Sequence, residues 1–236
     1  MSRFADTHHG FWLHLQALCE IIVVVLFIVT FLAQPFRIPS ESMLPTLRVG
    51  DFLLGNKQAY APRGALDSVL APESIQRGDI IIFRFPDDPK TYLVKRVIAL
   101  PGERVRLHAN TVFINGAPLS ESYAVYTPSP PNDFRDNFPS LRYADPDTSP
   151  AWWAAMRRST VDHEITVPSG HYFVLGDNRN DSEDSRYWGF VPKDMIVARP
   201  TFVYLSFSAP AVTKGTFSHR VWMNFRQELA SIRILR

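Results

Sequence analysis

A serine and a lysine are the residues of this sequence with the clearest potential for chemistry. Ser42 lies in the segment 39–47, PSESMLPTL, and Lys95 lies in the segment 92–97, YLVKRV. A serine hydroxyl becomes an effective nucleophile when a base accepts its proton, and a lysine amine can be that base if it is neutral near the working pH. The two residue types therefore suggest nucleophilic catalysis by a Ser-Lys pair.

Lys95 has to lose its proton well below the ordinary lysine pKa of about 10.4, and burial among apolar side chains lowers that pKa. In a strand, the period of two places apolar residues on the face of Lys95 and puts Arg96 on the opposite face. These apolar residues are Leu93, Val97 and Ala99. Spacing alone also fits a lysine that extends from a strand edge into water.

Ser42 is flanked by Pro39 and Pro45. Each proline fixes its own φ and disfavours helix at the preceding residue, so we expect an extended, preorganised segment around the hydroxyl. A Ser-x-Ser sequence between prolines also fits an ordinary turn, and the G-x-S-x-G motif of α/β-hydrolases is absent. Taken alone, the segment leaves both interpretations open.

A third polar segment, 176–186 with the sequence GDNRNDSEDSR, follows a strand-like apolar run. Such a segment predicts a loop with many internal hydrogen bonds, in which Asp184 and Arg186 could form an ion pair. The alternative is an acidic metal-binding loop, but the spacing does not match an EF-hand, and Arg179 and Arg186 would repel a dication. We therefore expect neither a metal ion nor another cofactor.

Residues 15–34 are almost entirely apolar, with Glu20 as their one formal charge. Roughly 20 such residues are needed to cross the apolar core of a bilayer as a helix. No small-x-small pair precedes a cleavage point, so we predict a retained transmembrane anchor rather than a cleaved signal, after a short amino-terminal segment 1–14. Arg3 and Arg37 give no asymmetry from which orientation could be predicted.

Short strand-like runs separated by turn residues follow the anchor and predict a mainly β domain with antiparallel hairpins, over residues 35–208. The runs are 51–54, 80–85, 92–100, 105–107, 111–114, 171–175 and 195–207. Residues 117–168 are rich in proline and aromatic side chains, and we interpret them as an insertion or cap on the β core. Residues 209–236 form a basic tail with helical spacing, which could dock on the domain or on a membrane surface.

Composition excludes some classes of protein. The formal net charge is +2, and no long basic run is present, so a nucleic-acid partner is not indicated. Cys19 is the single cysteine, so neither an internal disulfide nor a cysteine-ligated metal site is expected.

The segments around Ser42 and Lys95, and the polar segment 176–186, follow the anchor in this order and resemble the type I signal peptidases, the bacterial leader peptidase family. The resemblance implies a membrane-bound serine endopeptidase that removes amino-terminal signal peptides from exported preproteins. It also implies a single-pass protein of the bacterial cytoplasmic (inner) membrane, with its amino terminus in the cytoplasm and its catalytic domain on the outer, periplasmic side. The lipid bilayer is then a partner, and a contact with the translocation machinery stays open.

The resemblance also implies roles for individual residues. Ser42 corresponds to the nucleophile and Lys95 to the general base. Ser40 corresponds to the hydroxyl that completes the oxyanion hole with the Ser42 amide. Ser182 corresponds to the serine that orients the lysine amine, and Asp184 with Arg186 corresponds to a supporting ion pair.

Two departures from the family pattern lie near these residues. Glu41 occupies a position that often holds a small residue, and it could alter the charge beside the cleft. Asn180-Asp181 reverses the more familiar Asp-Asn order.

The resemblance implies that the substrate binds as an added β-strand between residues 36–40 and residues 92–94. It also implies that the substrate carries small side chains at the first and third positions before the cut. Four residues are candidates for its shallow apolar pockets: Phe36, Ile38, Met43 and Val94.

Three other interpretations compete with this one. A self-cleaving SOS-type repressor also uses a Ser-Lys pair, but it would carry a DNA-binding helix-turn-helix where this chain has its anchor. A catalytically silent, membrane-anchored interaction domain would have no need for Ser40, Ser42, Lys95 and Ser182 together. A specialised signal peptidase for one pilin or conjugative-transfer protein is the closest variant.

Overall fold

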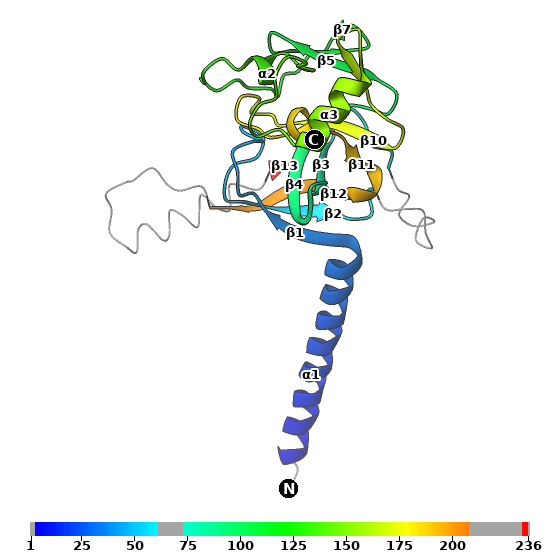
Figure 1. Cartoon of the computed structure of the whole chain (residues 1–236). Helices are drawn as coiled ribbons and strands as arrows, with labels where there is room; N and C mark the ends of the chain where they lie inside the picture. The colour runs from blue at the N-terminus through cyan, green and yellow to red at the C-terminus, as the bar shows by residue number, and fades with distance from the viewer. Residues whose placement is uncertain (1–2, 61–72, 208–232, 236) are drawn as a thin grey trace, which may run out of the picture.

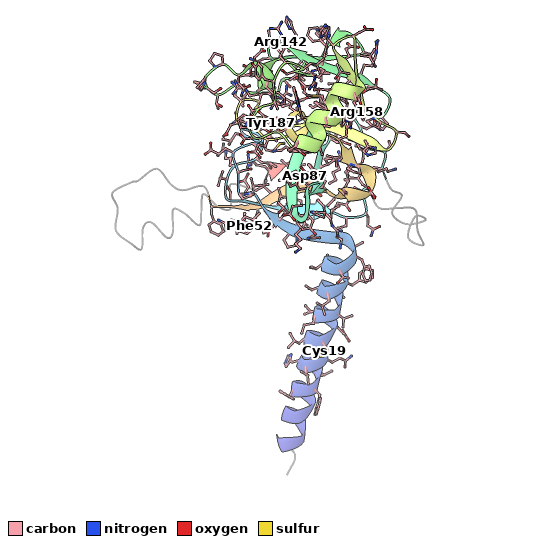
Figure 2. The ribbon with its side chains drawn as sticks, viewed as in Figure 1. Cys19, Phe52, Asp87, Arg142, Arg158 and Tyr187 are labelled. Atoms are coloured by element: carbon pink, nitrogen blue, oxygen red, sulfur yellow. The ribbon has the colours of Figure 1, made fainter. Side chains whose placement is uncertain are left out.

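The computed structural model describes residues 3–60, 73–207 and 233–235. A long amino-terminal helix, α1 (Arg3–Phe27), continues into a π-helical turn, η1 (Ile28–Leu32), and projects away from a β domain (Figure 1). The apolar stretch Phe11–Leu32 has the length and composition to cross a membrane, and no part of it is buried against the domain. Cys19 lies midway along this isolated helix (Figure 2). Lipid is the environment that would cover such a surface.

The helix ends two residues earlier than the expected span 15–34. Ala33 and Gln34 belong to β1 (Ala33–Arg37), where they pair with Asn56 and Gly55. Pro35 lacks an N–H donor and favours extended backbone, so it fits an edge strand better than a continuing helix.

The helix end is tied to the domain by hydrogen bonds. Lys57 Nζ donates to the carbonyl of Thr30 at 2.7 Å, and Gln58 Nε2 donates to that of Phe31 at 2.7 Å. The Lys57 N–H also donates to the Leu32 carbonyl at 3.0 Å. Carbonyls in the last turn of a helix lack intrahelical partners, so these contacts satisfy them. They also hold the β domain close to the end of the apolar helix.

The larger sheet has eight strands, all paired antiparallel, in the order β1-β2-β12-β3-β4-β10-β11, with β13 also pairing with β12. After β1, its strands are β2 (Asp51–Asn56), β3 (Ile80–Phe85), β4 (Asp88–Ala99), β10 (His171–Leu175), β11 (Val191–Pro192), β12 (Ile196–Ser206) and β13 (Arg233–Ile234). The mainly β, antiparallel fold expected from the sequence is confirmed.

A second, five-stranded antiparallel sheet lies at the end of the domain farthest from α1 (Figure 1). Its strands are β5 (Arg104–His108), β6 (Thr111–Ile114), β7 (Ala117–Pro118), β8 (Thr160–Val161) and β9 (Glu164–Thr166), in the order β7-β6-β5-β9-β8. The segment 117–168 supplies three of these strands, so it completes this sheet. Its short strands give too few residues for a period of two to be recognised.

The same segment contributes two helices, α2 (Asp133–Asp136) and α3 (Pro150–Ser159). Trp152 and Met156 of α3, four residues apart, are buried in the main core, where Trp152 stacks on Phe138. Two shorter helices, α4 (Ser185–Trp188) and η2 (Lys193–Met195), follow β10. The main core that holds Trp152 and Phe138 also contains residues of both sheets, so this aromatic burial joins the second sheet to the first.

Apolar clusters cover both faces of the larger sheet. Alternate residues of β3 enter different clusters: Ile81 and Phe83 join the main core, whereas Ile80 and Ile82 join a smaller one. The period of two in a strand produces this division. β4 therefore runs between two apolar layers.

The carboxyl-terminal tail 209–236 lies mostly outside the described residues. Its described part, Arg233–Ile234, is a strand rather than the helix that the spacing suggested, because it pairs with β12. Arg233 forms an ion pair with the buried Asp51, and Leu235 packs against the smaller cluster. This part of the tail docks on the domain.

Candidate active site

The fold brings Ser42 and Lys95 together from segments 53 residues apart. Lys95 Nζ lies 2.6 Å from Ser42 Oγ, within hydrogen-bond distance. Lys95 comes from the middle of β4, and Ser42 from the turn that follows β1. This contact is the geometry that transfer of a proton from a hydroxyl to an amine requires.

Burial sets the protonation of the lysine. Lys95 is 4% exposed and Ser42 is 8% exposed. Burial lowers the pKa of Lys95 from its ordinary value to about 8, although the nearby Asp184 acts in the opposite direction. A substantial fraction of the amine is therefore neutral in mildly alkaline solution.

The backbone around Ser42 is a series of turns, not the extended segment that the flanking prolines suggested. The Leu44 N–H donates to the Glu41 carbonyl at 3.0 Å, and the Leu47 N–H donates to the Met43 carbonyl at 2.9 Å. Met43 and Leu47 are fully buried in the smaller cluster. Their burial and these hydrogen bonds outweigh the local preference for extended backbone.

Ser40 lies beside Ser42. Its Oγ is 3.3 Å from Ser42 Oγ. The backbone N–H of Ser42 has no acceptor among the residues that the structure describes. A hydroxyl and a free N–H at one point could both donate to a negatively charged oxygen that forms there.

The polar loop after β10, residues 176–186, packs directly on the turn that contains Ser42. The Asn178 N–H donates to the Ser42 carbonyl at 3.1 Å, and Asn178 Nδ2 reaches the Glu41 carbonyl. A Cβ added at Gly176 would overlap both the Ser42 carbonyl oxygen and Ser182 Oγ. Glycine is therefore required for this close approach.

Asp184 and Arg186 form a fully buried ion pair at 2.8 Å. Burial alone would raise the pKa of Asp184, but Arg186 and a hydrogen bond from the Gly176 N–H hold it below its usual range. Arg186 also donates to the carbonyl of Arg179, at the other end of the loop. The pair therefore fixes the loop that carries Ser182.

Ser182 is buried beside the same site, and Gly176 lies between it and the Ser42 carbonyl. Its Oγ has no hydrogen-bond partner within the described part of the chain. Ser182 and Lys95 line the same cavity, so this position fits a hydroxyl that could orient the lysine amine.

A second buried ion pair was missed at the level of sequence. Arg96 donates to Asp177 through two nitrogens, at 2.7 and 2.6 Å, and Thr46 Oγ1 donates to the same carboxylate at 2.5 Å. The Arg96 guanidinium also lies over the Tyr123 ring at 4.0 Å. One carboxylate thereby links the turn that contains Ser42, strand β4 and the polar loop. In the sequence, the only signal for this ion pair was that Arg96 follows Lys95 and Asp177 follows Gly176.

A third buried pair anchors the other end of the loop. Arg179 contacts Glu121 through two nitrogens, at 2.8 and 2.6 Å, and both side chains are almost completely buried. The Arg179 N–H also donates to the Val125 carbonyl. Segment 121–127 thus runs alongside the polar loop, which explains how residues far from the catalytic segments support them.

A cavity of about 610 Å³ opens beside the pair. Ser40, Ser42, Lys95 and Ser182 all line it. Four of the residues expected to take part in catalysis therefore share one space. The volume falls within the usual range for a small-ligand site.

The four candidate pocket residues for the substrate lie on the other side of β4. Ile38 and Met43 are buried in the smaller cluster, and Phe36 and Val94 pack against it. The four line no part of the cavity described above. Their assignment to substrate pockets remains a prediction.

These features place a serine hydroxyl in contact with a buried, partly neutral lysine amine, on a β domain carried by an apolar helix. Residues 12–205 match the model of a protein family described as signal peptidase, peptidase S26. The chain therefore belongs to the peptidase S26 signal peptidase family, and it is a serine peptidase. With its apolar amino-terminal helix, it is a membrane-anchored member.

Curated relatives agree with this assignment. The chain is 36% identical over 206 residues to a signal peptidase I of Pseudomonas fluorescens, covering 82% of this chain and 72% of the relative. It is 31% identical over 226 residues to one of Aquifex aeolicus, covering 82% and 84%. A crystal structure of a signal peptidase I from Enterococcus faecalis is 36% identical, with a TM-score of 0.40, and covers 54% of this chain and 97% of that one.

The depressed pKa of Lys95 makes the stability of the protein depend on pH. The unfolded chain holds a proton on Lys95 up to about pH 10.5, whereas the folded protein releases it near 8, so stability rises with pH between these values. The difference between these two pKa values corresponds to roughly 3 kcal/mol in the free energy of unfolding. We expect Lys95→Met to be more stable than the wild type below pH 8, and this advantage to shrink by roughly that amount near pH 10.5.

Urea unfolding of both proteins in the same detergent, at several pH values, measures this difference. Lys90→Met provides a matched control, because Lys90 lies on the same strand and is exposed. A stability difference for Lys95→Met that does not vary with pH would contradict a depressed pKa.

Proposed function

We propose that this protein removes amino-terminal signal peptides from preproteins, as an endopeptidase that uses Ser42 as nucleophile and Lys95 as general base. The observation that carries the proposal is the 2.6 Å contact between Lys95 Nζ and Ser42 Oγ in a buried environment. Membership of the signal peptidase family supplies the class of substrate.

In the first half of the reaction, neutral Lys95 accepts the Ser42 proton as Oγ attacks the scissile carbonyl. The carbonyl oxygen becomes negatively charged, and the Ser40 hydroxyl with the Ser42 N–H stabilises it. The protonated Lys95 then donates its proton to the leaving amine. The peptide bond is replaced by an ester between the signal peptide and Ser42.

In the second half, Lys95 deprotonates a water, and the hydroxide attacks the ester carbonyl. The bond to Oγ breaks, Ser42 recovers a proton from Lys95, and the signal peptide leaves with a free carboxylate. We assign Ser182 the positioning of the Lys95 amine, since its buried hydroxyl lines the same cavity and has no partner among the described residues.

The substrate would bind as an extended strand beside residues 36–40, with residues 92–94 on its other side. The pockets proposed for its side chains involve Phe36, Ile38, Met43 and Val94. Because Ile38 and Met43 are already buried, only shallow depressions would form over them, and small side chains would be preferred.

We further propose that α1 crosses the cytoplasmic membrane of a bacterium once, with the catalytic domain on the outer side. The contacts of Lys57 and Gln58 with the end of the helix hold the domain near the bilayer. A signal peptide that is itself embedded in the bilayer could then reach the site.

Two rivals are less well supported. The relatives are described as signal peptidases I, which favours the general activity over a peptidase dedicated to one pilin or transfer protein. A silent interaction domain would not need a buried, partly neutral lysine in contact with a serine hydroxyl, because burying an amine costs stability.

Removal of either member of the pair should abolish cleavage. We expect Ser42→Ala and Lys95→Ala each to lower the rate of preprotein cleavage in detergent by at least about a thousandfold, since nucleophile and base act as a unit. Ser74→Ala and Lys90→Ala change exposed residues of the same types and should retain activity. Cleavage that survives Ser42→Ala or Lys95→Ala would contradict the assignment.

The pH dependence should identify the base. Lys95 must be neutral to accept a proton, so kcat/KM should rise with pH and level off above its pKa of about 8. A histidine base would give a midpoint near 6.5, and an ordinary exposed lysine a midpoint near 10.4. A profile that is flat between about pH 6 and pH 10 would exclude titration of the base in this range.

A further inference from the structure

The two sides of the catalytic pair differ in chemical character. β4 sends Val94 towards the smaller apolar cluster, whereas Leu93 packs on the main core and, with Lys95, lines the cavity. The proposed pockets for the signal peptide therefore lie on one side of the strand. The cavity lies on the other side, where the amine is.

The direction in which the product leaves follows from the chemistry. Lys95 has to protonate the leaving amine, so this nitrogen must come within hydrogen-bond distance of Nζ. The residues after the cut are attached to that nitrogen. They must therefore begin at the cavity that Lys95 lines, while the signal peptide stays attached to Ser42.

Carboxylates surround this cavity. Five exposed acidic residues line it: Glu41, Asp88, Asp147, Asp181 and Glu183. None of the five forms an ion pair within the described part of the chain. Asp88 alone has a side-chain donor there, the Thr91 hydroxyl at 2.7 Å.

The positive charges of the cavity do not balance these carboxylates. Arg135 is the only cation besides Lys95 among the lining residues. Its guanidinium is mostly buried, and it is already occupied by Asp136 at 2.7 Å and by the carbonyl of Pro130. The cavity therefore presents a net negative potential to its contents.

A second observation marks the cavity as a place where a ligand binds. Ser182, more than nine-tenths buried, lines it, and its hydroxyl has no partner among the described residues. Ser42 and Lys95 line the same space. The acidic residues thus surround a reactive centre rather than an arbitrary patch of surface.

We propose that this cavity binds the first residues after the cleavage site and selects preproteins with lysine or arginine at these positions. The inference rests on the proposed function and adds to it a preference for the mature part of the substrate. Asp147 comes from the segment 117–168, so this segment would contribute to specificity.

The test uses three forms of one preprotein that differ only at the second and third residues after the cut, with Lys-Lys, Ala-Ala or Glu-Glu. We expect kcat/KM to fall in that order, with a ratio of Lys-Lys to Glu-Glu of about fivefold or more at low salt, because several weak charge interactions add. Raising the salt concentration to about 0.5 M should reduce the ratio, since the carboxylates are exposed.

A double variant, Asp147→Asn with Asp181→Asn, should lower the ratio at least about twofold and leave the pH profile for Ala-Ala unchanged. Glu183 is kept, because its charge also acts on the pKa of Lys95. Asp162→Asn with Asp194→Asn removes two exposed carboxylates outside the cavity, and this control should keep the wild-type ratio.

Equal kcat/KM for Lys-Lys and Glu-Glu, or an equal loss of the ratio in both double variants, would overturn the charge preference. In either case, continued cleavage of Ala-Ala would leave the proposed function intact. If none of the three preproteins were cut, the proposed function would fail, and this inference would fail with it.

Discussion

Burial of one amine is the constraint on which the rest of this structure depends. Lys95 can act as a base near neutral pH only if its surroundings disfavour the ammonium form, and removing the charged form from water does so at a cost to stability. The fold supplies this environment by placing the lysine in the middle of β4, covered on both faces. The contact with Ser42 places this amine where it could accept the hydroxyl proton.

The other charged groups of the site serve this arrangement. Two carboxylates, Asp177 and Asp184, are buried completely, and each is matched by a buried arginine at 2.6 to 2.8 Å. Separating the partners of such a pair would leave an unpaired charge in the interior, which is costly. The polar loop that carries Asp177 and Asp184 therefore has little freedom to move. The pairs thus keep the loop against the turn that contains Ser42, while the Lys95 amine itself has no carboxylate within ion-pair distance among the described residues.

The candidate residues Ser42 and Lys95 could be predicted from the sequence because the patterns around them are local. Pro39, Gly176 and the apolar neighbours of Lys95 are all visible in short segments, and the resemblance of three such segments to a known family led to the catalytic roles proposed for Ser42 and Lys95. The strands with a regular period of two were predicted for the same reason.

Features that depend on contacts between distant segments were not predicted. The pairing of Arg96 with Asp177 joins residues 81 positions apart, and no spacing rule connects them. The turn at Ser42 results from the burial of Met43 and Leu47, which outweighs the preference set by the prolines. The strand at 233–234 likewise depends on β12, which offers it a partner.

The most direct test of this account is the protonation of Lys95 itself. Isotopic labelling of the lysine side chains, with the Lys95 signal assigned by its absence in Lys95→Met, allows its titration to be followed by NMR in detergent. We expect a midpoint near pH 8, well separated from those of exposed lysines such as Lys90. A midpoint near 10.4 would contradict it, because the amine would then be protonated at the pH at which the enzyme is proposed to act.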